Sequence, residues 1–171
     1  MKSTNWFKTT LAAWPIIFGI VAGICYLTTL VSEWAGHPLP SQPSLEAIRN
    51  MRGLKLTMWC LIIVIGAPLA EELIFRFCLF RAPLWVTGKM LKAGPQRIVS
   101  VVLAVVSAIL FTAAHYRGIP LNNAFVALFA FGIAQCVLLR RTHKLLSPIL
   151  NHALFNSTNL VLLFAFPNAV Q

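Results

Sequence analysis

The chain has 171 residues, 58% of them hydrophobic and only 11% charged, and it carries a formal net charge of +10. Soluble domains average about 45–50% apolar and about 25% charged residues. So little charge cannot cover the surface of a soluble globular domain, and so much apolar sequence excludes a disordered chain or a small secreted disulfide scaffold. The composition therefore leaves an integral membrane protein.

Apolar runs in chain order predict five spanning helices. The first, residues 11–31, is longer than the apolar core of a signal peptide, which has about 7–15 residues. A spanning helix needs about 20 mostly apolar residues, and the runs cover 11–31, 56–80, 98–114, 123–139 and 145–166. Between them we expect a turn at 116–122 and short interfacial helices at 44–51 and 82–92. The predicted fold is an all-α, polytopic transmembrane helical bundle, with about five spanning helices plus short interfacial helices.

The basic residues predict how the chain is oriented. With a cytoplasmic N-terminus, the cytoplasmic side holds nine of them: Lys2, Lys8, Arg81, Lys89, Lys92, Arg97, Arg140, Arg141 and Lys144. The opposite side then holds four: Arg49, Arg52, Lys55 and Arg117. Since cytoplasmic loops carry the excess of Lys and Arg, we expect a multi-pass protein of the cell inner (cytoplasmic) membrane with its N-terminus in the cytoplasm. Basic residues scattered between apolar runs also argue against a nucleic-acid partner.

The acidic residues are few and unevenly placed. There are four glutamates and no aspartate, and the adjacent pair Glu71 and Glu72 lies with Arg76 inside the apolar run 56–80. A charged side chain at the bilayer centre costs at least about 2.5–3.5 kcal/mol, and such residues normally face the bundle interior or a water-filled cavity and mark a functional site. The simpler alternative is a helix boundary at which Arg76 reaches the membrane surface and the glutamates face water.

Spacing connects these residues to polar groups on two other predicted helices. Glu72 and Arg76 are four residues apart, so they share a helix face and can pair. The same spacing separates Phe111 from His115, and His152 from Asn156, so the two residues of each pair also share a helix face. With Glu71, these three pairs are the candidate site residues. Three helices thus present polar groups that can converge in a bundle interior.

The residue types narrow the chemistry. The chain has no Gly-x-Ser nucleophile motif, no H-E-x-x-H zinc motif and no aspartate, which argues against rhomboid-like serine, zinc and aspartyl proteases. What remains is a glutamate-based site with two histidines and an asparagine. A desolvated glutamate is a competent general base for water, and a His can orient that water. A second His and an Asn can stabilise an oxyanion, at about 3–4 kcal/mol per donor.

These elements resemble those of a known family. E-E-x-x-x-R at 71–76, F-x-x-x-H at 111–115 and H-x-x-x-N at 152–156 occur in the order and approximate spacing of the CPBP family. These are the CAAX-protease and bacteriocin-processing proteins, also called Abi or type II CAAX prenyl endopeptidase-like proteins. The flanking segments APLAEELIFR and LLSPILNHALFN also look like family segments, and the resemblance covers residues 66–160.

The resemblance implies a glutamate-dependent intramembrane endopeptidase acting on a membrane-associated peptide or protein. It implies that Glu71 is the water-activating base and His115 its partner, and that His152 and Asn156 stabilise the oxyanion. The residues implied to support the site are Glu72, Arg76 and Phe111. This mechanism needs no cofactor, although two His and two Glu leave a zinc ion as the alternative.

The resemblance also implies a division of the chain, which we expect to be one integral membrane domain over 1–171. Residues 1–55 are then an N-terminal anchor helix and polar loop, and residues 56–166 the catalytic helical core. The chain departs from the family in two respects: Phe77 stands where Gly is common after the motif Arg, and about five helices replace about eight. The shorter chain leaves a second copy or an accessory subunit as possible partners beside membrane lipid and substrate.

Two other functions stay open, and one geometric difficulty remains. The Glu71–Glu72 pair also suits an ion or proton pathway, and the same scaffold also suits a non-enzymatic or bacteriocin-immunity factor. In straight helices over these runs, Glu71 lies about 22 Å from the outer end of its helix, whereas His115 lies at the outer end of the next. The two residues can meet only if the second helix continues past Arg76 or the third is tilted or begins deeper.

Overall fold

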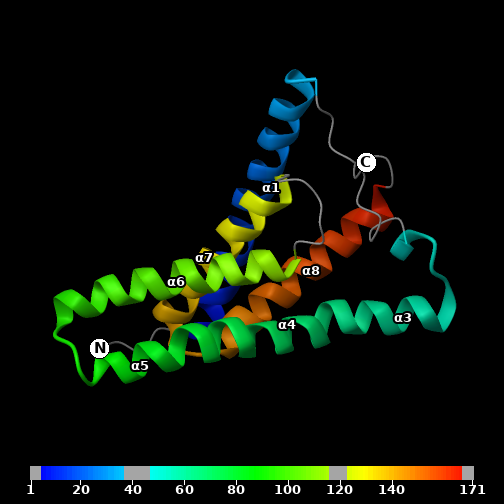
Figure 1. Cartoon of the computed structure of the whole chain (residues 1–171). Coiled ribbons are helices and arrows are strands. Elements are labelled where there is room, and N and C mark those ends of the chain that lie inside the picture. Colours follow the sequence, from blue (N-terminus) through cyan, green and yellow to red (C-terminus); the bar gives the residue numbers. More distant parts are fainter. Residues whose placement is uncertain (1–4, 37–46, 116–122, 167–171) are drawn as a thin grey trace.

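The computed structural model describes residues 5–36, 47–115 and 123–166, and within these ranges the regular structure is entirely helical (Figure 1). The first helix is α1 (Trp6–Trp34). A continuous helical run follows, made of α3 (Gly53–Leu61), η1 (Ile62–Gly66), α4 (Ala67–Glu71), η2 (Glu72–Arg81) and α5 (Ala82–Gly88). The remaining helices are α6 (Ala93–His115), α7 (Asn123–Thr142) and α8 (Leu146–Ala165).

Four helical stretches in the described residues are long and apolar enough to cross a membrane. They are Trp6–Trp34, Gly53–Gly88, Ala93–His115 and Phe125–Thr142. The fifth predicted run forms α8, which has 20 residues but is less apolar because it carries Asn151, His152, Asn156 and Asn159. The predicted all-α, polytopic helical bundle is therefore confirmed, with α8 outside the four stretches that are apolar enough to cross a membrane.

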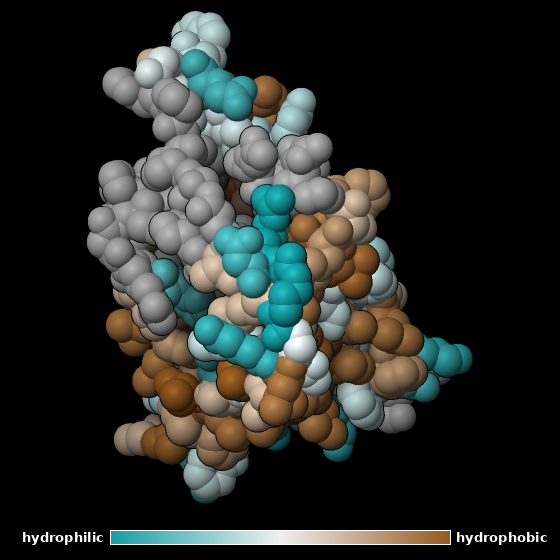
Figure 2. Space-filling model, turned by 90° about the vertical axis from the view of Figure 1, so that its right-hand side faces the viewer, coloured by the Kyte–Doolittle hydropathy of each residue, from teal (hydrophilic) through white to brown (hydrophobic). Residues whose placement is uncertain are grey.

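The surface agrees with a membrane location. Large apolar side chains lie exposed along every long helix, among them Ile16, Leu54, Val101 and Val161. On the face shown in Figure 2, hydrophilic atoms gather in patches while most of the lower half is hydrophobic. Water-soluble monomers rarely expose apolar surface so widely. Lipid chains cover such a surface without cost, so the protein is a multi-pass membrane protein.

The second predicted helix is longer than its apolar run. The sequence predicted an end near residue 80 and a separate interfacial helix at 82–92, and this is wrong: α5 continues η2 without a break to Gly88. The run Gly53–Gly88 has 36 residues, about 54 Å at 1.5 Å per residue, against a hydrocarbon core of about 30 Å. Glu71 lies near its middle, which removes the difficulty about depth. Of the other helix predicted at 44–51, residues 47–49 are helical and 44–46 lie outside the described residues, as does the turn at 116–122.

Two prolines explain the geometry of this long helix. A proline inside a helix has no N–H, and its ring clashes with the carbonyl four residues earlier. Each π-helical segment, η1 and η2, lies directly before such a proline, Pro68 or Pro83. The turn widens there, because the N–H of Ala67 donates to the carbonyl of Ile62 and that of Ala82 to Phe77, five residues back. The helix thus continues through both prolines, and π turns of this kind often occur at functional sites.

The core lies where α1, η2, α6 and α7 meet. Its buried members are Ile17, Val21, Phe75, Phe111, Ala127 and Phe131. At Gly132 an added Cβ would stand 2.9 Å from the Cβ of Ala108 and 3.0 Å from its Cα, so α6 and α7 approach each other closely. Small residues permit this kind of contact between membrane helices. Phe111 lies beside Arg76 of the long helix, and Phe131 lies beside His152 of α8.

Candidate active site

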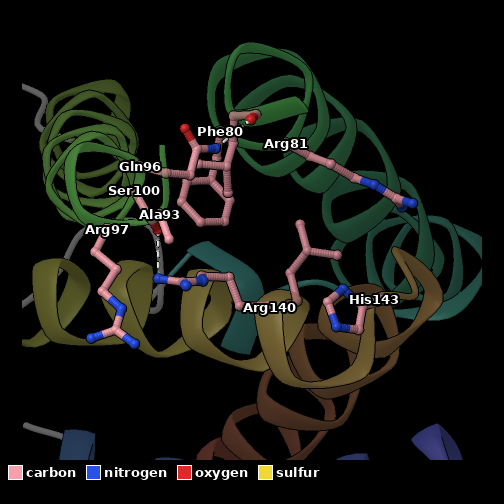
Figure 3. A pocket seen from close by; sticks show the side chains of 10 residues that line it. Phe80, Arg81, Ala93, Gln96, Arg97, Ser100, Arg140 and His143 are labelled. Atoms are coloured by element: carbon pink, nitrogen blue, oxygen red, sulfur yellow. Dashed lines mark hydrogen bonds between the residues drawn. The ribbon is translucent and has the colours of Figure 1, made fainter. Parts of the chain in front are cut away.

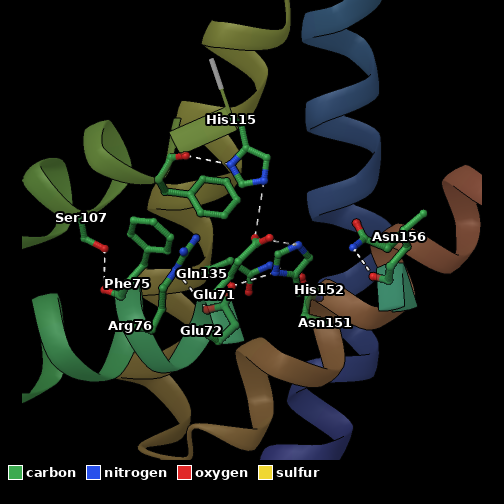
Figure 4. A network of polar contacts seen from close by, with 12 residues as sticks. Glu71, Glu72, Phe75, Arg76, Ser107, His115, Gln135, Asn151, His152 and Asn156 are labelled. Carbon is green, nitrogen blue, oxygen red and sulfur yellow. Dashed lines mark hydrogen bonds and ion pairs between the residues drawn. The ribbon is translucent and has the colours of Figure 1, made fainter. Parts of the chain in front are cut away.

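Polar side chains from three helices meet in the interior of the bundle (Figure 4). Glu71 and Glu72 lie at the junction of α4 and η2, His115 is the last residue of α6, and His152 lies on α8. The long helix, α6 and α8 thus bring these four side chains together in the bundle interior. The three sequence motifs therefore converge, as predicted.

Glu72 and Arg76 form a buried ion pair. The Nε atom of Arg76 lies 3.1 Å from Oε2 of Glu72, and both side chains are fully buried. The guanidinium carbon stands 4.5 Å from the ring centre of Phe111, which adds a cation–π contact. The Nη atoms of Arg76 have no hydrogen-bond partner among the described residues. Its charge is therefore compensated by Glu72 and an aromatic face, and the alternative of a solvated helix boundary is wrong.

His152 is held by the same glutamate. Its Nδ1 lies 2.9 Å from Oε1 of Glu72. Its ring packs edge-on against Phe131, with the ring centres 4.9 Å apart. A carboxylate only accepts hydrogen bonds, so Nδ1 carries the proton and donates it to Glu72. The other ring nitrogen, Nε2, then faces Glu71 at 3.8 Å from Oε2.

His115 approaches Glu71 from the other side. Its Nδ1 donates to the carbonyl of Phe111 at 2.8 Å, and Nε2 stands 3.6 Å from Oε2 of Glu71. The side chains of His115 and Glu71 are 34% and 23% exposed, whereas that of His152 is 5% exposed. Glu71 therefore stands between two imidazole nitrogens. It and His115 form the open edge of the site, whereas Glu72, Arg76 and His152 are buried.

Asn156 lies one turn beyond His152 on α8, and its Nδ2 donates to the carbonyl of Ile63 at 2.8 Å. Local geometry explains this contact. In a π turn that carbonyl would accept from the N–H of residue 68, which is proline and has none. The N–H of Ala67, the α-helical donor, is already bonded to Ile62. Asn156 thus satisfies a carbonyl that Pro68 leaves without a helical donor.

We expect Asn156→Ala to lower stability by about 1–3 kcal/mol, because the Ile63 carbonyl loses its donor. In a Pro68→Ala background the same substitution should cost much less, since residue 68 regains an N–H. Thermal unfolding in detergent of the four proteins in this cycle measures the coupling. Equal costs in both backgrounds would contradict the explanation. An activity loss that persists in the Pro68→Ala background would support the oxyanion role implied by the family.

Two site neighbours were not predicted from the sequence. Gln135 on α7 donates through Nε2 to Oδ1 of Asn151 on α8 at 2.9 Å, and both side chains are fully buried. Asn151 precedes His152, so this bond ties α7 to the turn of α8 that carries the histidine. The signal in the sequence was an amide side chain inside each apolar run, 123–139 and 145–166, because polar side chains in such runs normally face a bundle interior.

The ligand set for a metal is limited. Among the described residues, no group of three or more His, Cys, Asp or Glu side chains is arranged to hold a metal ion. Glu71, His115 and His152 come closest in kind, and their facing atoms are 3.6 and 3.8 Å apart. Zinc bonds to nitrogen and oxygen are about 2.0–2.2 Å long, which places two tetrahedral ligand atoms roughly 3.4 Å apart, so zinc stays the alternative that a chelator tests.

Fold and site together define a class: a multi-pass membrane protein with a Glu–His site in the interior of its helical bundle. Residues 53–158, 106 of the 171, match the family model described as Type II CAAX prenyl endopeptidase Rce1-like. The chain therefore belongs to this family of membrane proteases, which confirms the family inferred from the three motifs. All the residues of those motifs lie inside the matched segment. Searches of curated proteins and of solved structures gave no match.

Proposed function

We propose that the protein hydrolyses a peptide bond of a membrane-associated peptide or protein, with water activated by Glu71. The observation that supports this most directly is the position of Oε2 of Glu71 between the Nε2 atoms of His115 and His152, at 3.6 and 3.8 Å. These separations exceed a direct hydrogen bond, and a polar gap of this size suits a bridging water molecule. Membership of a protease family gives the reaction type.

In the proposed first step, Glu71 takes a proton from water while the water oxygen attacks the carbonyl carbon of the peptide. His115 orients the water through Nε2, because its Nδ1 proton is committed to the Phe111 carbonyl. The carbonyl π bond breaks and its electron pair becomes the oxyanion of a tetrahedral intermediate. Glu71 then returns its proton to the amide nitrogen as the C–N bond breaks and the oxyanion re-forms the carbonyl, which releases an amine and a carboxylic acid.

His152 is the proposed donor to the oxyanion. To donate through Nε2 while Nδ1 donates to Glu72, it must carry protons on both ring nitrogens. Glu72, buried and 2.9 Å from Nδ1, accepts the Nδ1 proton and so fixes the orientation of the ring. Arg76 holds Glu72 in place, so the ion pair supports His152 rather than touching the substrate. Asn156 remains a second candidate donor through the amide hydrogen that Ile63 does not use.

The proposed setting of the reaction follows the charge distribution. We place the protein in the cytoplasmic membrane with its N-terminus inside, with lipid around it and a peptide or membrane protein as substrate. The mechanism requires no cofactor. A second copy of the chain, or an accessory subunit, is the proposed source of any further walls of the substrate site.

Cleavage by the purified protein tests this function. Proteomic comparison of membranes with and without the protein supplies candidate peptides, and each is incubated with the protein in detergent. We expect hydrolysis at one peptide bond, read by mass spectrometry, and no change when a zinc chelator is added, because Glu71 and not a metal activates the water.

Two other results would contradict the proposal. Loss of cleavage on chelation, restored by zinc, would show a metal centre in place of a glutamate base. Absence of cleavage by well-folded protein over all the candidates would favour a non-enzymatic or immunity role, and a proton-flux assay in vesicles would then test the transport alternative.

A further inference from the structure

A second polar feature lies at the far end of the bundle from His115. It is a cavity of about 360 Å³ between the end of η2, the corner from α5 to α6 and the end of α7 (Figure 3). Three arginines, Arg81, Arg97 and Arg140, line it together with His143. Phe80, Leu84 and Leu139 form its apolar walls.

The cavity carries positive charge that no acidic side chain balances. No aspartate or glutamate lines it, and none of its arginines takes part in an ion pair among the described residues. Like charges gathered around one hollow repel each other, and a bound anion removes that repulsion. The arginine guanidinium presents a planar fork of donors that fits phosphate oxygens in pairs.

The cavity is built rather than a chance gathering of surface side chains. Nη1 of Arg140 donates to Oγ of Ser100 at 2.6 Å, and Ser100 is 1% exposed. Nε2 of Gln96 donates to the carbonyl of Leu84 at 2.8 Å, which fixes the corner between α5 and α6. Both bonds set the positions of lining residues before any ligand binds.

His143 adds evidence from the backbone. It has φ of 56°, in the left-handed region, where a side chain other than glycine costs about 1–2 kcal/mol. Its N–H donates to the carbonyl of Leu139 at 2.8 Å, which closes the end of α7. Glycine would end this helix without strain. A histidine at this strained position, with its imidazole lining the cavity, is consistent with a role for the side chain in ligand binding.

The helix dipole acts in the same direction. Ala93 and Gln96, in the first turn of α6, line the cavity. This helix has 23 residues and no acidic side chain in its first turn. The positive end of a helix favours a bound anion. Pro95 has no N–H and that of Gln96 donates to the carbonyl of Lys92, so the first-turn N–H groups that can face a ligand are those of Ala93 and Gly94.

The cavity is separate from the Glu71 site. Ala93 and His115 are at opposite ends of α6, about 33 Å apart at 1.5 Å per residue. Phe80, Cys136 and Leu139 pack into a buried cluster behind the cavity. Basic pockets between membrane helices, near the surface of the bilayer, commonly hold acidic lipid headgroups.

We propose that this cavity binds a negatively charged phosphate, either the phosphate in the headgroup of an anionic phospholipid or a free phosphate ion. Arg97 and Arg140 bind the phosphate oxygens, and the apolar walls adjoin the rest of the ligand. The proposal does not depend on the reaction at Glu71.

Binding of soluble short-chain lipids to the whole protein in neutral detergent tests the proposal. Dihexanoyl phosphatidylglycerol is titrated while the thermal midpoint is followed, and dihexanoyl phosphatidylcholine and sodium phosphate are titrated in parallel at constant ionic strength. We expect a saturable rise in midpoint with an anionic ligand. The double variant Arg97→Gln/Arg140→Gln should weaken the apparent affinity at least tenfold.

The matched control is Arg141→Gln/Lys144→Gln, which removes two positive charges from exposed positions beside the cavity that do not line it. It should bind like the wild type. Arg140→Lys, which keeps the charge but loses the paired fork, should weaken binding and covers the case in which the double variant fails to fold. A response to phosphatidylglycerol alone identifies a lipid, and an equal response to sodium phosphate identifies free phosphate. Equal weakening in the control and the cavity variants, or no saturable response, would overturn the proposal.

Discussion

Glu71→Gln is expected to abolish peptide hydrolysis while the protein still folds and inserts. The amide keeps the shape of the side chain but cannot accept a proton from water. General-base catalysis contributes about a hundredfold to ten-thousandfold, so kcat/KM should fall by at least about that factor. The measurement is cleavage of the substrate peptide by purified wild type and variant at equal folded concentration.

The environment of Glu71 explains why the protein should still fold after this substitution. Its side chain is 23% exposed, and its Oε2 atom accepts no hydrogen bond from any residue that the structure describes. Loss of its charge therefore leaves no buried partner unpaired. Its two neighbours, the Nε2 atoms of His115 and His152, stand beyond hydrogen-bond distance at 3.6 and 3.8 Å.

Glu33→Gln is the matched control for this substitution. Glu33 lies exposed near the end of α1, so its change removes one acidic charge far from the site. It should cleave like the wild type. Retained activity in Glu71→Gln would remove Glu71 as the base, and equal losses in both variants would point to the net charge of the protein instead.

The parts of the site that follow from local spacing could be predicted from sequence. Glu72 and Arg76 are four residues apart in one helix, and this spacing alone brings them together. A buried charge pair inside an apolar run also predicts a bundle interior rather than a lipid-facing surface. The structure shows both, with the two side chains fully buried.

The parts that depend on prolines could not be predicted in the same way. The end of the apolar run at residue 80 suggested the end of a helix, but a π turn carries the chain through Pro83 to Gly88. Pro68 frees the Ile63 carbonyl, and only the packing of α8 against η1 shows that Asn156 bonds to it. The hydrogen bond between Gln135 and Asn151 also depends on helix packing. The two residues lie on different helices, so their spacing in the sequence does not predict that they meet.

The second large effect is expected from the buried ion pair. Glu72→Gln leaves the Arg76 guanidinium buried without a counter-charge, and Arg76→Ala leaves Glu72 with His152 alone. Removing one member of a buried pair costs about 3–5 kcal/mol. Each single variant should therefore unfold at a markedly lower temperature in detergent and show reduced cleavage per folded molecule.

The double variant Glu72→Gln/Arg76→Met separates stability from catalysis. Replacing a whole buried pair by neutral groups of similar size is often neutral or stabilising, so its thermal midpoint should recover much of the loss. Cleavage should not recover, because His152 no longer has a carboxylate 2.9 Å from Nδ1 to orient its ring. Recovery of both stability and cleavage would show that the pair only supports the fold. Single variants that unfold like the wild type would contradict the expected cost of leaving one member of this buried pair without its partner.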